Sequence, residues 1–208
     1  MTTSERIRTE ALRLFADRGY AGTTITDIER AAGLSPGSGS VYRHYPTKRA
    51  ILEAGVADRI DGATDLAEKL ADSAELDALP LPQRLVVMAR TGLRRLEEEG
   101  DLTRLVLRDL SQFPDLLARV GNEDIGRTFA AFGAWLRHQS EIEDSAPQDW
   151  DAVAMVLMGA VTHFWIVRDV FGQHPTGMDE DRYLAATTAM ALALLQTRRA
   201  PAGTSADR

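Results

Sequence analysis

A chain of 208 residues, 44% of them hydrophobic and 26% charged, is expected to fold around a packed core, and this composition excludes a disordered protein. The chain contains no cysteine, which excludes a disulfide framework and a thiolate metal site and suits a reducing cytoplasm. The formal net charge of −7 is unevenly divided: residues 1–50 carry eight cations and five acids, whereas the remainder carries 16 cations and 26 acids. A basic N-terminal part on an acidic body is typical of a protein in which only that part meets a polyanion.

No segment predicts a secretory signal or a membrane span. The first residues are charged and are not followed by the run of about 7 to 15 apolar residues that a signal peptide needs. The longest uncharged run, residues 152–167, has 16 residues and includes Thr162 and His163. A membrane span needs about 20 predominantly apolar residues. We therefore expect a buried helix there, and a cytoplasmic protein without a membrane partner.

The first third of the chain is expected to form short helices followed by a long one. The patterns favour helices over residues 4–18, 25–32, 40–45 and 48–70. Gly19 is a natural stop for the first of them. Thr24 and Asp27 form a capping-box pattern for the second, which Gly33 ends, and Thr47 can cap the long helix.

The remaining two thirds also have helical patterns only. Helices are expected over residues 83–99, 102–110, 116–139, 149–171 and 179–199, with an interruption around Gly121 and Gly126. Strand-like alternation with hairpin turns is absent from the sequence, so it predicts an all-α fold of about nine helices. Residues 200–208 are expected to be a disordered tail.

The stretch GLSPGSGSVYRHYPTK, residues 33–48, predicts a helix-turn-helix. It places glycines and hydroxyl side chains between two short helices and follows them with aromatic and basic residues. The leading end of a recognition helix must enter a major groove about 12 Å wide, where small residues allow close approach and hydroxyls can donate to or accept from base edges. Val41 and Tyr45 would face inward and fix this helix against the others.

Two segments resemble a known family. TTITDIERAAGLS and SVYRHYPTKRAIL resemble the N-terminal DNA-binding domain of TetR/AcrR-type transcriptional regulators, over residues 5–55. The Gly19-Tyr20 stop, the Thr23-Thr24 start and the aromatic-Pro-x-Lys exit into the long helix belong to this resemblance. Members of the family usually have six residues between the glycine that ends the second helix and the tyrosine of the third, whereas residues 34–41 number eight. The extra pair falls in Ser-Pro-Gly-Ser-Gly-Ser.

The chemistry of the turn and the resemblance together give a set of DNA-binding candidates. These are Thr24, Thr26, Ser38, Gly39, Ser40, Tyr42, Arg43, His44 and Lys48. The small residues would approach base edges, whereas the tyrosine, histidine and lysine would donate to phosphate oxygens that flank the groove. For Thr24 the capping role comes first, and a phosphate contact by either threonine is a secondary expectation.

The helix over residues 149–171 carries apolar residues on two sides, so both sides must be covered. One side can face its own core and the other a partner subunit, with the last helix completing a four-helix seam between two chains. The interface candidates are Val153, Leu157, Phe164, Val167, Leu184, Thr188 and Leu192. A monomer in which this helix is central is the alternative. A twofold dimer would place two recognition helices in major grooves about 34 Å apart, on a palindromic operator.

The resemblance implies a helix-turn-helix domain over residues 1–47 followed by a ligand-sensing and dimerisation domain over residues 48–199. Candidates for ligand contacts are Met88, Thr91, Phe129, Phe132, Trp135, Met155, Met158 and His163. Methionine and aromatic side chains suit an apolar small molecule, because their surfaces adapt to varied shapes. The same side chains can equally be ordinary core, and the histidine a core or interface residue.

The sequence therefore predicts a homodimeric, ligand-responsive transcriptional regulator: a repressor that a small apolar or aromatic effector releases from its double-stranded DNA operator. The alternative is a helical protein-interaction module without sequence-specific DNA binding. The four histidines are never four or fewer residues apart, and a Gly-x-Ser-x-Gly nucleophile motif is absent. We accordingly expect neither an enzyme nor a cofactor or metal site.

Overall fold

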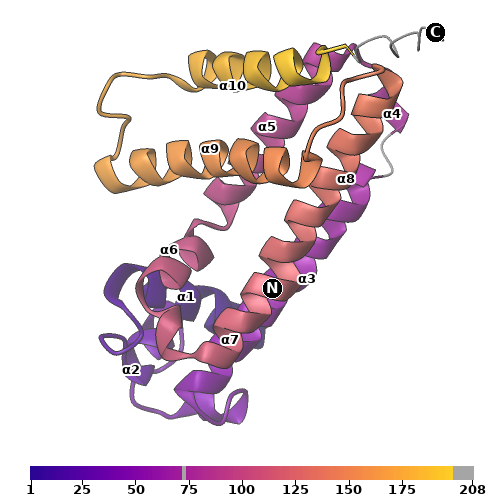
Figure 1. Ribbon diagram of the computed structural model, residues 1–208. Helices are drawn as coiled ribbons and strands as arrows, with labels where there is room; N and C mark the ends of the chain where they lie inside the picture. Colours follow the sequence, from indigo (N-terminus) through magenta and orange to yellow (C-terminus); the bar gives the residue numbers. More distant parts are fainter. Residues whose placement is uncertain (72–73, 199–208) are drawn as a thin grey trace, which may run out of the picture. The chain divides into compact units, whose positions relative to one another are not determined.

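The structure is a computed structural model that describes residues 1–71 and 74–198, and the side chains of residues 1–62 and 76–198. Within these residues all regular structure is helical, apart from one isolated bridge between Ser145 and Arg198 (Figure 1). The all-α prediction is thus confirmed. The predicted tail, residues 200–208, lies outside the described residues.

The elements run in chain order as α1 (Thr3–Arg18), α2 (Ile25–Ala31), the 3-10 helix η1 (Ser40–Arg43), α3 (Lys48–Ala71), α4 (Ala74–Asp77), α5 (Leu81–Glu98), α6 (Gly100–Arg108), η2 (Leu110–Gln112), α7 (Pro114–Arg119), η3 (Val120–Ile125), α8 (Gly126–Ile142), α9 (Trp150–Phe171) and α10 (Glu180–Leu195). The predicted interruption around Gly121 and Gly126 is the π-helical turn η3. The helix predicted over residues 83–99 is α5, and Gly100 just beyond it is the first residue of α6.

The chain divides by packing into two compact units. Among the described residues, unit 1 consists of residues 1–68 and 96–127, and unit 2 of residues 69–71, 74–95 and 128–198. The segment that forms the predicted helix-turn-helix therefore shares its packing unit with α6 and α7. The division of function at residue 47 stays a prediction.

The core of unit 1 joins the first helices to α6. α1 buries one face completely, because its apolar residues recur every three or four positions. The large apolar side chains with no exposed surface include Ile7 and Phe15 of α1, Ile28 of α2, Val41 of η1, Ile51 and Leu52 of α3, Leu105 of α6 and Leu110 of η2. Full burial of each large apolar side chain contributes about 1.5 to 3 kcal/mol to folding.

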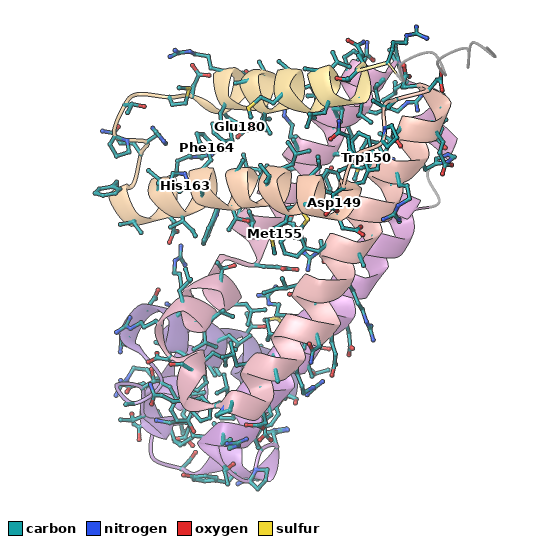
Figure 2. The ribbon with its side chains drawn as sticks, in the orientation of Figure 1. Asp149, Trp150, Met155, His163, Phe164 and Glu180 are labelled. Carbon is teal, nitrogen blue, oxygen red and sulfur yellow. The ribbon has the colours of Figure 1, made fainter. Side chains whose placement is uncertain are left out.

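The core of unit 2 lies among α5, α8, α9 and α10. Its buried residues include Leu85 of α5, Leu136 of α8, Leu157 of α9 and Leu195 of α10. α9 and α10 are neighbours in Figure 1, and Figure 2 shows Phe164 between them.

Aromatic and polar contacts join α9 to α10. The Phe164 ring stacks on Tyr183 of α10 with centroids 4.2 Å apart, and the Tyr183 hydroxyl donates to the Ala160 carbonyl at 2.6 Å. α9 is long and apolar enough to cross a membrane by length and composition alone. It buries Leu157, Val161 and Phe164 in unit 2, whereas Met155 and Val156 are exposed. The buried helix predicted for residues 152–167 is therefore buried on one side only.

Candidate nucleic-acid interface

Helix α2 begins at the capping box that the sequence predicts. Thr24 Oγ1 accepts from the Asp27 N–H at 3.1 Å, and the Asp27 carboxylate accepts from the Thr24 N–H at 3.0 Å. Hydrogen bonds from the Thr24 hydroxyl and N–H lower the pKa of the Asp27 carboxyl. Thr24 is exposed and Thr26, in the first turn of α2, is half-buried. Both DNA-binding assignments stay predictions.

The turn between α2 and η1 is built by three glycines. Gly33, Gly37 and Gly39 have φ angles of +70°, +79° and +66°, in the left-handed region that other residues disfavour. The Leu34 N–H donates to the Glu29 carbonyl at 2.8 Å and ends α2. The enlarged Ser-Pro-Gly-Ser-Gly-Ser segment is therefore an ordered turn with its own internal bonds.

Glu29 anchors this turn, although sequence reasoning did not select it as a site residue. Its side chain has no exposed surface. Its Oε2 accepts from the Gly37 N–H at 2.6 Å, and its Oε1 lies 3.4 Å from the hydroxyl oxygens of Ser38 and Ser40. Burial raises the pKa of Glu29, but the N–H groups of Gly37, Val41 and Ser40 more than offset this, so the net shift is downward.

The recognition element η1 is held from inside by two residues. Val41 is fully buried and Tyr45 is 9% exposed, which confirms the inward orientation predicted for both. The Tyr45 hydroxyl lies 2.8 Å from Ser4 Oγ of α1 and also donates to the Ser4 carbonyl at 3.2 Å. These contacts fix η1 against the first helix.

The outer side of η1 carries polar and aromatic groups that can reach a ligand outside the chain. Tyr42 is 53% exposed, and Arg43 and His44 are exposed as well. Gly39, whose backbone is in the left-handed region, precedes them. A Cβ added there would lie 3.6 Å from the Tyr42 ring, which is an ordinary van der Waals contact. A phenol, a guanidinium and an imidazole in sequence can all donate to phosphate oxygens or base edges.

Lys48 is engaged inside the chain. Its Nζ donates to the carbonyls of Tyr20 and Thr23 at 2.7 and 2.8 Å and lies 4.3 Å from the centroid of the Tyr20 ring. Burial lowers the pKa of the ammonium. An ammonium has three donors, so one hydrogen is left for the predicted phosphate contact, which stays untested.

The segment from α6 to α7 supports the same region through Tyr20. The Tyr20 ring lies between Phe15 of α1 and Phe113, with centroid distances of 5.2 and 4.8 Å. The Asp109 carboxylate accepts from the Tyr20 N–H at 3.1 Å. Gly19, whose φ is +83°, passes so close that an added Cβ would lie 3.2 Å from this carboxylate. The predicted Gly19-Tyr20 stop is therefore a packed junction.

The predicted ligand-binding residues of unit 2 differ in burial. Met88 is buried, whereas Met155 is 63% exposed and His163 is exposed, both on α9 (Figure 2). Half-buried members of the set are Thr91, Phe129, Phe132, Trp135 and Met158. The Phe132 and Trp135 rings of α8 stack with centroids 5.8 Å apart. Their roles in ligand binding stay predictions.

The predicted interface residues lie mostly inside unit 2. Leu157, Phe164, Leu184 and Thr188 are buried within the chain, and Val153, Val167 and Leu192 are half-buried. The large apolar residues of α9 and α10 that stay exposed are others: Met155, Val156, Val170, Phe171 and Met190.

A metal site is not apparent in the part of the chain that the structure describes, where groups of three or more His, Asp or Glu side chains suited to a metal ion are absent.

The comparisons with known proteins agree with the geometry. Residues 7–54 match the family of bacterial regulatory proteins, tetR family. The HTH-type transcriptional repressor KstR2 of Mycolicibacterium smegmatis is 36% identical over 64 residues, which are 31% of this chain and 30% of that protein. The uncharacterized HTH-type transcriptional regulator YerO of Bacillus subtilis is 44% identical over 48 residues, or 23% of this chain and 16% of that protein. The chain thus matches less than a third of the length of either relative.

The fold likeness extends over nearly the whole chain. A TetR-family transcriptional regulator from Mesorhizobium loti matches with a TM-score of 0.71 at 21% identity, covering 92% of this chain and 95% of that one. At this identity the likeness concerns the fold.

Proposed function

We propose that the chain, whose residues 7–54 match the tetR family of bacterial regulatory proteins, is a TetR/AcrR-type regulator: a homodimeric repressor that binds a palindromic DNA operator and is released by a small apolar or aromatic molecule. The observation that carries the proposal is the recognition element η1. Its inner side is anchored by Val41 and Tyr45, while Tyr42, Arg43 and His44 are exposed in succession. Rigid backbone with exposed donors is what sequence-specific contact to DNA requires.

The exposed faces of α9 and α10 support the dimer. On α9, Val156 and Val170 are 64% and 69% exposed, and the exposed Gly159 lies between them with no atom within 4 Å of an added Cβ. On α10, Met190 is 61% exposed. A second copy that covers these residues would form a four-helix seam in which small residues allow close approach. This seam replaces the buried residues Leu157, Phe164 and Leu184 as the contact surface.

The effector is proposed to bind in unit 2 among the half-buried aromatic and methionine side chains of α5, α8 and α9. α3 extends from Lys48 at the exit of the helix-turn-helix to Ala71, so a change in its position can alter the spacing of the two recognition elements. Coupling of about 1 to 3 kcal/mol corresponds to a change of roughly 5 to 150-fold in DNA affinity.

Selection of bound sequences from a random double-stranded pool tests the proposal directly. We expect an inverted repeat whose half-sites are about 10 base pairs apart or a multiple of this. Small apolar and aromatic molecules are then screened for release of the selected DNA at constant salt. Recovery of sequences without a common motif would instead favour the helical protein-interaction module, and tight effector binding without loss of DNA affinity would contradict the coupling.

A DNA-binding regulator of this family acts where the chromosome is, so we propose a cytoplasmic location. An enzymatic activity is not proposed, because the relatives are transcriptional regulators.

A further inference from the structure

The carboxylate of Glu29 is the end point of a chain of hydroxyl hydrogen bonds. Ser38 Oγ donates to Ser40 Oγ at 2.8 Å, and Ser40 Oγ lies 3.4 Å from Glu29 Oε1. The other carboxylate oxygen accepts from the Gly37 N–H at 2.6 Å. An ionised carboxylate only accepts hydrogen bonds. Ser38 Oγ also lies 3.4 Å from Glu29 Oε1, so each hydroxyl hydrogen is directed either to the carboxylate or to the other serine.

This arrangement goes beyond what a glycine turn needs. The positive φ angles of Gly33, Gly37 and Gly39 would form a turn without any buried charge. Burying a carboxylate is costly unless donors surround it. Here the Gly37 N–H donates to it at 2.6 Å, and the N–H groups of Ser40 and Val41 also lower its pKa, as in the anion-binding concavities formed by backbone amides. The N-cap residue of η1 is Gly39, which has no side chain to cap the helix. The Glu29 carboxylate therefore lies at the end of η1 that lacks a cap.

Each serine hydroxyl has one hydrogen and two acceptor lone pairs. When Ser40 donates to Glu29 and Ser38 donates to Ser40, neither hydroxyl keeps a hydrogen for a base edge. Both can still accept. In the major groove the amino groups of adenine and cytosine are donors, whereas guanine N7 and O6 and thymine O4 are acceptors.

We propose that Glu29 is a specificity-determining residue that acts from inside the protein: it orients the Ser38 and Ser40 hydroxyls so that they accept from adenine or cytosine amino groups and reject guanine and thymine acceptors. The inference rests on the proposed DNA-binding function and deepens it. It also assigns a purpose to the two extra residues of the turn, which bring both serines within reach of the carboxylate.

Glu29→Gln is the test variant, because the amide has nearly the same shape but carries two donor hydrogens. Its NH2 group can donate to a serine oxygen and free that hydroxyl to donate. Glu10→Gln on α1 is the matched control, since it changes the charge equally in the same unit, at a half-buried surface side chain that pairs with Arg13. Sequences are selected from a random pool by the full-length wild type and both variants at one salt concentration.

We expect the wild type to select adenine or cytosine on the strand that faces the serines in each half-site, because these bases place an amino group there. In Glu29→Gln the ratio of affinities for guanine over adenine at these positions should rise by about tenfold, the size of one base contact. Affinity for random DNA should stay unchanged, and Glu10→Gln should keep the wild-type preference. An unchanged preference in Glu29→Gln, or an equal loss on all sequences, overturns the inference.

Hydrogen exchange of the free proteins separates this inference from the proposed function. The Gly37 amide should exchange at least about tenfold faster in Glu29→Gln, since a charged acceptor is replaced by a neutral one. Equal exchange rates in the two proteins would contradict the claim that the Glu29 carboxylate holds the turn, whatever the DNA selection gives. Faster exchange without any selected motif in the wild type overturns the proposed function, and the specificity role of Glu29 with it.

Discussion

Glu29 should make the stability of unit 1 depend on acid. Its pKa is lower in the folded chain than in the unfolded chain, because backbone N–H groups outweigh the effect of burial. As the pH falls, the unfolded chain therefore takes up the proton first. The stability that the ionised carboxylate confers is complete above the unfolded pKa of about 4.3 and is lost as the pH falls through the folded pKa.

Thermal unfolding of wild type and Glu29→Gln between pH 7 and pH 3 measures this effect. We expect the wild type to be more stable by a constant margin from pH 7 to about pH 5, and the margin to shrink below about pH 4.3. Asp27 and Asp115 also have lowered pKa values, but they are common to both proteins and cancel in the difference. A margin that stays constant down to pH 3 would show that the carboxylate is not the titrating group.

Lys48 is expected to contribute to stability as well as to DNA binding. Its ammonium donates to the carbonyls of Tyr20 and Thr23, and a charged hydrogen bond contributes about 1.5 to 3 kcal/mol. Lys48→Ala should lower the free energy of unfolding in urea by about this amount. Arg43→Ala is the control, because this exposed side chain should weaken DNA binding while the unfolding free energy changes by less than about 0.5 kcal/mol. Equal unfolding free energies for both variants would refute the internal role of Lys48.

The contrast between these residues shows what the sequence could predict. Caps and inward positions were predictable, since Thr24, Asp27, Val41 and Tyr45 follow from local spacing. Glu29 was not. In the sequence it is one acid beside buried Ile28, and only the folded turn brings the Gly37 N–H to its carboxylate. Local patterns fix which residues form α2, but partners eight to eleven positions away depend on the path of the turn.

At the scale of helices, the crossing of α1 and α3 depends on one glycine. An added Cβ at Gly55 would lie 2.7 Å from Cγ of Leu12, so α3 approaches α1 more closely than any other residue allows. Gly62, on the same helix, is exposed and has no atom within 4 Å of an added Cβ. The two positions differ in packing but share their helical context.

Alanine should therefore have opposite effects at the two glycines. Gly55→Ala should destabilise the protein by about 1 to 3 kcal/mol through overpacking, whereas Gly62→Ala should stabilise it by about 0.5 to 1 kcal/mol through helix propensity. Urea unfolding followed by circular dichroism measures both. If Gly55→Ala were stabilising as well, the close approach of α1 and α3 would be wrong.

The junction of α1 with the α6–α7 segment was beyond prediction from the pattern of helices. The sequence favours helices over 102–110 and 116–139 but gives no partner for them. In the structure Asp109 binds the Tyr20 N–H, and Arg49 of α3 pairs with Asp115 of α7 at 2.6 Å. These are contacts between residues more than 60 positions apart, and their side chains are ordinary surface types in the sequence. The helices were therefore predictable, and their grouping into units was not.

At the scale of the whole molecule, DNA binding should depend on how many copies bind together. Each recognition element brings its own phosphate contacts, and the logarithm of affinity falls with the logarithm of salt in proportion to their number. A dimer on an inverted repeat uses both elements at once, which raises affinity by about 100-fold or more over a single one. The oligomeric state and the salt dependence of DNA binding therefore both report whether two recognition elements contact the DNA at once.

Val156→Asp should distinguish DNA binding by a dimer from DNA binding by a monomer. Val156 is 64% exposed on α9, and a carboxylate there would be buried without a partner in the seam. We expect this variant to sediment as a monomer, to bind the selected operator about 100-fold more weakly, and to show roughly half the salt slope of the wild type. Val87→Asp on α5 makes the same change at a side chain that is 39% exposed, and should remain dimeric with the wild-type slope. A Val156→Asp protein that stays dimeric would move the seam away from α9, whereas a monomer with an undiminished slope would mean that one copy makes all the phosphate contacts.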